Sequence, residues 1–272
     1  MSYRNRTIRS AALVLALGAP SMAQDVTAQA FHSPHAINLS TANTLSQGDL
    51  LIEISHRFFP PVEEGGEALW GLDGPVANRL GLSFGASDHL TLGVLRSNLD
   101  DNLEVNLKAR VLDLSSRSMS FQLGVMGGIA WNMSPALVAG AEDNESQGYA
   151  QAMLNVNVEE MVSVGVVPTY LRNPRIRDTE ADDAFVLGLH AQGYLTESVS
   201  VLGEWIVSEE REGQAFDSGS FGIELETRGH FFKILVTNQV RMNPTQVLGG
   251  AADEFEPAEW RLGFNITRRL AF

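Results

Sequence analysis

The side chains with the greatest catalytic potential in this sequence are its histidines, because imidazole can act as a general base beside a nucleophile. The six are His32, His35, His56, His89, His190 and His230. One way to place a nucleophilic serine beside its base on a single β-strand is the pattern His-x-Ser, which brings both side chains to one face of the strand. None of the six has serine two residues on, and the nearest analogue is His89-Leu90-Thr91. The sequence therefore predicts no serine nucleophile of this kind.

Neighbouring acids are a second arrangement that could support hydrolysis, because carboxylates facing a histidine can activate a water molecule. Asp100-Asp101 and Asp182-Asp183 are such pairs. His190 follows the second pair but lies further along the chain, within an apolar segment. We interpret both pairs as solvated loop acids, which is typical of polar connections.

A metal site would need several imidazole, thiolate or carboxylate ligands. The chain contains no cysteine, and His32-Ser33-Pro34-His35 has no acid close by in the sequence. Pro34 also prevents the two histidines from sharing one helical face. We therefore expect no metal and no cofactor.

The overall charge excludes one class of partner. The chain of 272 residues has 19 basic and 33 acidic side chains, a net charge of −14 at pH 7. Nucleic acid is not expected as a ligand, because the chain has no basic surface to neutralise phosphates. Only two lysines occur, Lys108 and Lys233.

The first residues have the pattern of a secretory signal. Arg4, Arg6 and Arg9 precede a short apolar run over residues 11–19, and Ser21-Met22-Ala23 follows. The run is too short for a transmembrane helix but suits a signal peptide. We predict a signal peptide over 1–23, an N-terminal periplasmic or plug segment over 24–48, and one domain over 49–272.

That domain is expected to be all-β, because apolar and polar residues alternate along it with a period of two. Leu103, Val105 and Leu107 alternate with Glu104 and Asn106, for example. We count twelve such segments, and most are long for a soluble protein but suitable for strands that cross a bilayer. They begin near residues 49, 76, 89, 102, 118, 147, 161, 184, 198, 218, 229 and 259.

The connections between these segments favour a transmembrane antiparallel β-barrel of about 12 strands. Long acidic connections, such as 60–75 and 132–146, alternate with tight ones, such as Ala86-Ser87-Asp88. Long loops at one end, short turns at the other and an even strand number are typical of such barrels. A soluble barrel or sandwich is the alternative, since periodicity does not say which face points inward.

The last segment carries an expected assembly signal. Phe264, Ile266, Leu270 and the terminal Phe272 share one face. An amphipathic strand ending in phenylalanine resembles the signal that the bacterial outer-membrane assembly machinery reads. The expected location is therefore the outer membrane of a Gram-negative bacterium, with outer-membrane lipid and this machinery as partners.

Several residue groups together resemble an uncharacterised family of bacterial outer-membrane β-barrels, catalogued as a domain of unknown function. These groups are Ile37-Asn38, Thr41, Leu45, Gly48, Ile54-Ser55-His56-Arg57-Phe58, residues 79–85, Asp88-His89-Leu90, Thr237-Asn238 and residues 263–268. The resemblance covers most of residues 31–272 and implies a barrel and a secretion route, but no activity. Pro60-Pro61 stands where the family pattern has a glycine, which affects the first loop.

The alternation also predicts which charged side chains point into the lumen. They are Glu53, Arg57, Arg79, Glu104, Lys108, Arg110, Glu204, Glu224, Glu226, Lys233 and Arg261. Acids and bases are nearly balanced in this set, so we expect them to pair across a narrow interior, with Glu53 and Arg57 near Arg261.

The resulting functional prediction is a non-enzymatic barrel that serves as an anchor or narrow conduit. A small-solute transport channel and an outer-membrane enzyme with an extracellular-rim site are the alternatives. A periplasmic partner protein is also left open, as are the roles of His32, His35 and His56.

Overall fold

The computed structural model describes residues 31, 33–116, 118–134, 146–159, 161–174, 183–208, 216–227 and 229–272. The predicted signal peptide over 1–23, residues 24–30, His32 and Asp182 lie outside the described residues.

Twelve strands form the body of the protein in its described parts. They are β1 (Leu50–Phe58), β2 (Val76–Ser87), β3 (Leu90–Ser97), β4 (Asn102–Ser115), β5 (Met119–Asn132), β6 (Ser146–Val158), β7 (Val162–Arg172), β8 (Asp183–Thr196), β9 (Val199–Val207), β10 (Ser218–Thr227), β11 (His230–Thr237) and β12 (Arg261–Leu270).

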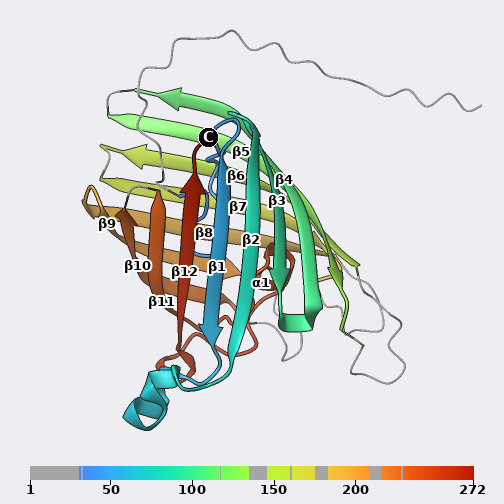
Figure 1. The fold of residues 1–272 in the computed structure, drawn as a ribbon, viewed down its shortest axis with the longest axis vertical. Helices are drawn as coiled ribbons and strands as arrows, with labels where there is room; N and C mark the ends of the chain where they lie inside the picture. Colours follow the sequence, from blue (N-terminus) through green and yellow to red (C-terminus); the bar gives the residue numbers. More distant parts are fainter. Residues whose placement is uncertain are drawn as a thin grey trace, which may run out of the picture.

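The strands close into one antiparallel barrel (Figure 1), which confirms the predicted fold class. Each strand pairs with its neighbours in sequence, and β1 pairs with β12 to complete the ring. At this junction Ile54 lies opposite Ile266, and Arg57 lies opposite Gly263. Closure satisfies the backbone hydrogen bonds of every strand, which is the requirement for a sheet in a bilayer.

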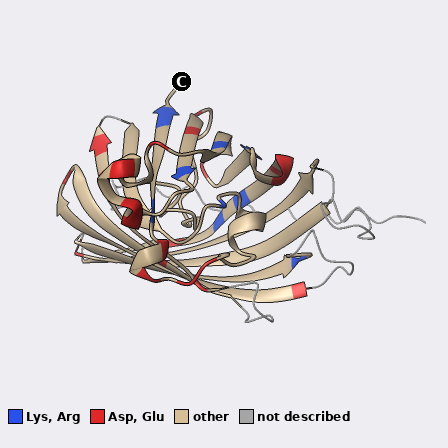
Figure 2. Cartoon of the chain, turned by 90° about the horizontal axis from the view of Figure 1, so that it is seen from below, with Lys and Arg blue, Asp and Glu red and all other residues tan. Residues whose placement is uncertain are grey.

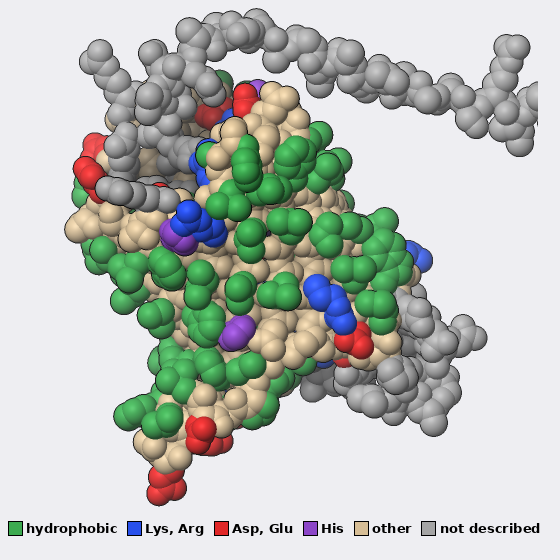
Figure 3. Space-filling model, in the orientation of Figure 1, with side chains coloured by type: hydrophobic (Ala, Val, Ile, Leu, Met, Phe, Trp, Pro, Cys, Tyr) green, Lys and Arg blue, Asp and Glu red, His purple; other side chains and the backbone are tan. Residues whose placement is uncertain are grey.

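Side-chain alternation explains how the barrel is oriented. On β1, Ile52 and Ile54 are exposed on the outer surface, whereas Glu53, Ser55 and Arg57 are buried inside. The space-filling view in Figure 3 shows the resulting outer face, on which green apolar side chains are spread over the strands and charged side chains are few. The outside is therefore apolar and the inside polar, the reverse of a soluble barrel.

The two ends of the barrel differ as predicted. Short turns join β2 to β3, β4 to β5, β6 to β7, β8 to β9 and β10 to β11, and both the start of β1 and the C-terminus lie at this end. The other end carries the longer connections, which include η1 (Val62–Gly71), α1 (Pro244–Val247) and η3 (Pro257–Glu259). The connection between β3 and β4, which holds η2 (Leu99–Asp101), is the short exception at this end.

Within the described residues, none of the helices combines the length and the apolar composition that a membrane crossing requires.

Candidate functional site: a lumen occupied by two chain segments

The lumen wall carries a group of buried charged side chains. Their exposed fractions are 5% or less, and the group comprises Glu53, Arg57, Arg79, Glu104, Lys108, Glu204, Glu224 and Lys233. All eight come from the predicted inward set. These charges were expected to pair with one another across a narrow interior, and two such ion pairs form, but most of the groups also contact chain segments inserted into the lumen.

The first inserted segment is the chain before β1. We call Phe31 together with residues 33–48 the N-terminal plug, because nearly all of these residues are buried. The carboxylate of Glu204 on β9 anchors its centre. Glu204 Oε2 accepts hydrogen bonds from the backbone N–H groups of Ile37, Asn38 and Leu39 at 3.2, 2.8 and 2.7 Å. The Asn38 amide donates to the other oxygen, at 3.0 Å.

Both lysines of the chain hold the same segment through its carbonyl groups. Lys108 on β4 donates to the carbonyl oxygens of Pro34 and Thr41, at 3.0 and 3.3 Å. Lys233 on β11 donates to the His35 carbonyl at 2.6 Å and forms an ion pair with Glu224 at 3.2 Å. The plug is therefore attached to strands at well separated positions around the ring.

Arg57 connects the plug to the junction of β1 and β12. Its guanidinium donates to the side-chain oxygens of Asn38 at 3.0 Å and Asn265 at 2.8 Å. Asn265 in turn donates to the Ile37 carbonyl, at 2.8 Å. The neutral amides thus take the place that carboxylates were expected to occupy beside Arg57.

The second inserted segment comes from the connection between β11 and β12. We call residues 238–251, which include α1, the loop plug, because they too are largely buried. Glu104 on β4 accepts hydrogen bonds from the backbone N–H and the hydroxyl of Thr245, both at 3.1 Å, and from the Tyr149 hydroxyl at 2.9 Å. Arg79 donates to the Met242 carbonyl and pairs with Glu53. Viewed from the long-loop end, chain segments cross the barrel interior (Figure 2).

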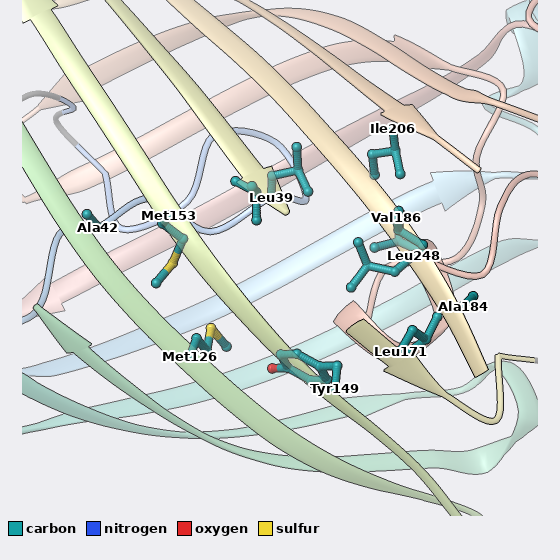
Figure 4. Packing of buried hydrophobic residues seen from close by; sticks show 12 residues of the cluster. Leu39, Ala42, Met126, Tyr149, Met153, Leu171, Ala184, Val186, Ile206 and Leu248 are labelled. Carbon is teal, nitrogen blue, oxygen red and sulfur yellow. The ribbon is translucent and has the colours of Figure 1, made fainter. Parts of the chain in front are cut away.

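An apolar cluster joins the two plugs to the wall. Leu39 and Ala42 from the N-terminal plug belong to the same cluster as Val247 and Leu248 from the loop plug. Figure 4 shows these side chains together with those of β5–β9, including Met126, Tyr149, Met153, Leu171, Ala184, Val186 and Ile206. The lumen therefore contains a small hydrophobic core of its own.

Three residues of the predicted lumen set lie outside this arrangement. Arg110 approaches Asp113 at 3.4 Å, and Glu226 is half-buried close to the β10–β11 turn. Arg261 pairs with Asp253 and Glu259, at 2.9 and 3.0 Å. The expected proximity of Arg261 to Glu53 and Arg57 is thus not observed.

The strand register explains this difference. Arg57 lies opposite Gly263, so that Arg261 falls beyond the end of β1 and donates instead to the Phe59 carbonyl, at 2.8 Å.

Sequence reasoning missed the neutral members of the site. Asn155 accepts a hydrogen bond from the Ala42 backbone N–H, and Gln147 donates to the Asn173 carbonyl, at 2.9 Å. Asn243 of the loop plug donates to Asn102 at 2.5 Å. The inward position of the strand residues follows from alternation. The sequence does not indicate, however, that these amide side chains form hydrogen bonds with inserted segments of the chain.

The histidines occupy three different settings. His190 is buried in the lumen beside Phe31, with ring centroids 4.8 Å apart, and its ring nitrogens contact no hydrogen-bond partner among the described residues. His35 lies in the N-terminal plug, where burial lowers its pKa to about 3. His56 is on the outer face of β1, and the centroid of its ring lies 4.5 Å from that of Phe264.

No group of three or more metal-ligating side chains occurs among the residues that the structure describes.

The predicted assembly signal lies on the outer surface of β12. Phe264, Ile266 and Leu270 are half-buried, whereas Phe272 is 86% exposed. Phe272 thus contributes little packing to the barrel.

Comparison with solved structures finds similar barrels at low sequence identity. The NanC porin has a TM-score of 0.48 at 10% identity and covers 82% of this chain and 100% of its own. The KdgM porin has a TM-score of 0.45 at 10% identity, over 82% and 99% of the two chains. Outer membrane phospholipase A from Escherichia coli has a TM-score of 0.45 at 11% identity, over 83% and 90%.

A search of curated proteins finds no significant match. A family model described as a membrane bound beta barrel domain matches residues 31–270, which include both plugs and all twelve strands. The chain therefore belongs to this family of membrane-bound β-barrels, DUF5777.

Proposed function

We propose that this chain is a non-enzymatic barrel of the Gram-negative outer membrane, and that it acts as a narrow conduit closed by the N-terminal plug. One observation carries this proposal: the charged wall side chains Glu204, Lys108 and Lys233 bind the main chain of an inserted segment. A barrel that only anchors partners would not need a lumen wide enough to hold separate chain segments. The signal pattern at the N-terminus supports the location.

The polar wall is suited to a water-filled path once the plug moves. Glu204, Lys108 and Lys233 would then face water and could bind ions or polar solutes. The plug connects directly to β1 at the short-turn end. A periplasmic partner protein pulling on the preceding residues would therefore displace it without unfolding the barrel.

An engineered disulfide can test whether plug movement opens the barrel. A Cβ atom at Gly124 on β5 would lie 3.2 Å from the Cβ atom of Ala42. This is close to the separation of about 3.5–4.5 Å in disulfides. The chain has no cysteine of its own, so A42C/G124C would form the only pair. Oxidation would lock the plug against the wall.

The measurement is single-channel conductance of purified protein in a planar bilayer. We expect the unmutated chain to show no large, stable steps. Glu204→Ala removes the acceptor for three plug N–H groups and should produce intermittent openings. In the triple variant, which combines Glu204→Ala with A42C/G124C, forming the disulfide should abolish these openings and reducing it should restore them. Glu204→Ala with each single cysteine is the control.

The outcomes separate the alternatives. Large steps from the unmutated chain would indicate an open transport channel. If neither Glu204→Ala nor the reduced triple variant conducts, although each is still folded as a barrel, the chain would be a permanently closed anchor. Either result would contradict the proposal.

A further inference from the structure

The outer surface of the barrel carries an apolar groove of about 620 Å³. It extends across β7 to β12, and its exposed walls include Val201, Phe221 and Ile234. Gly193 and Gly203 form part of its lining, and their missing side chains leave the surface hollow. This volume is in the range of ligand pockets, about 300–1,000 Å³.

The position of the groove restricts what can occupy it. Its outer walls are apolar side chains on the face of the strands that a membrane-bound barrel turns towards lipid. An occupant must therefore be apolar and must lack groups that need hydrogen bonds, because the hydrocarbon region supplies no water. An acyl chain satisfies both conditions.

A row of outward side chains connects this groove to the short-turn end of the barrel. Ile234, which lines the groove, lies opposite Phe264, and Phe232 lies opposite Ile266 in the next outward pair. The row ends at His230, which lies opposite Arg268. Four residues of strand separate Ile234 from His230, a distance of about 13 Å. This is close to half of a hydrocarbon core about 30 Å thick.

The polar end of the row is basic. Arg268 is exposed, and its Nη1 lies 2.8 Å from Nδ1 of His230. The His230 ring stacks on Phe232, with centroids 5.8 Å apart. Figure 3 shows basic and histidine side chains grouped within the apolar surface over β11 and β12.

Two other arginines that point outward differ from Arg268. Arg96 pairs with Asp101 at 2.5 Å, and Arg172 pairs with Asp183 at 3.3 Å. Both lie at the long-loop end. In the described parts of the chain Arg268 has no such carboxylate, so its guanidinium is available to an external anion.

We infer that this surface is a binding site for one phospholipid of the leaflet at the short-turn end. Its phosphate pairs with Arg268 beside His230, and one acyl chain follows Phe232 and Ile266 into the groove. Arginine matches phosphate through two parallel hydrogen bonds, and the spacing between the two subsites is that of a headgroup and the middle of the bilayer. The inference requires only a membrane-bound barrel and does not depend on whether the lumen opens.

Native mass spectrometry of the full-length, detergent-purified protein with added phosphatidylglycerol tests both subsites separately. Arg268→Gln should weaken the binding of the first lipid about tenfold, the loss expected for a charge-assisted hydrogen bond. Gly203→Leu fills the groove and should cause a similar loss while leaving Arg268 intact. The control Arg172→Gln changes an outward arginine at the opposite end and should have no effect. Unheated gel mobility checks that each variant is a closed barrel.

Competition distinguishes lipid from free phosphate. Inorganic phosphate at millimolar concentration should leave lipid binding unchanged, because it gains nothing from the groove. Displacement by phosphate, with Gly203→Leu behaving as the unmutated chain, would indicate a simple anion site and overturn the inference. Equal lipid binding by all three variants would also overturn it.

Discussion

Glu204 illustrates what a single buried residue does in this lumen. Its carboxylate binds three consecutive N–H groups of the N-terminal plug, which have no regular secondary structure to satisfy them. An unsatisfied buried donor costs about 1–3 kcal/mol, and hydrogen bonds to a charged acceptor are the stronger ones. Glu204 is therefore one of the main attachments of the plug, beside Lys108 and Lys233.

Replacing Glu204 should release the plug locally before it affects the barrel. We expect Glu204→Ala to increase hydrogen exchange of the amides of residues 37–39 by at least about 100-fold, since three donors lose their acceptor together. Glu204→Gln keeps one oxygen acceptor and should have a smaller effect. Hydrogen-exchange mass spectrometry in lipid vesicles measures this, with Glu226→Gln as the control. Unchanged exchange in Glu204→Ala would mean that other contacts suffice.

His35 should make plug attachment sensitive to acid. Burial lowers its pKa to about 3 from 6.5; the charge of Glu53 opposes this shift, and the charges of Lys108, Arg79 and Lys233 add to it. A detached plug binds a proton below about pH 6.5, whereas the attached plug does so only near pH 3. Attachment should therefore weaken as the pH falls from about 6.5 towards 3. His35→Gln should lose part of this dependence in the same exchange experiment, compared between pH 7 and pH 5. Identical pH profiles for both chains would contradict the assignment.

The sequence predicts the strands well but does not predict the contacts between the plugs and the wall. Every predicted strand start lies within two residues of the observed one, because alternation and turn composition are local properties of the sequence. The plug contacts are not local: Glu204 and Asn38 are 166 residues apart. The loop plug has no periodic pattern, and its α1 helix is only 4 residues long. The sequence predicts that Glu104 points inward, but not that Thr245 meets it.

The last strand provides a prediction that separates packing from recognition. Phe272 is 86% exposed, so deleting it removes little contact area from the folded barrel. If the assembly machinery reads this residue, deletion should nevertheless reduce the amount of protein in the outer membrane severalfold. Phe185→Ala, at a phenylalanine that is 72% exposed on β8, is the matched control and should leave the amount unchanged. Equal membrane levels of both variants would assign no role to the terminal residue.

For the whole molecule, barrel closure and secretion together predict a recognisable biochemical behaviour. The closed ring leaves no free sheet edge at which unfolding can begin. Unheated protein should therefore migrate faster than boiled protein on a denaturing gel, and it should sediment with the outer membrane. Sequencing of the mature chain should begin at Gln24 if cleavage follows Ala23. Recovery from the soluble periplasm would contradict the membrane location.

The position of the N-terminal plug also has a consequence for the order in which this protein matures. The plug precedes β1, so it is made and exported before any strand. Yet its hydrogen-bond partners include Lys233 on β11 and Asn265 on β12, which leave the ribosome last. The N-terminal plug is therefore exposed to proteases until β11 and β12 have been exported and folded. Protection of residues 33–48 from digestion would thus report completed biogenesis, and a chain truncated before β11 would be cut there however well its earlier strands had paired.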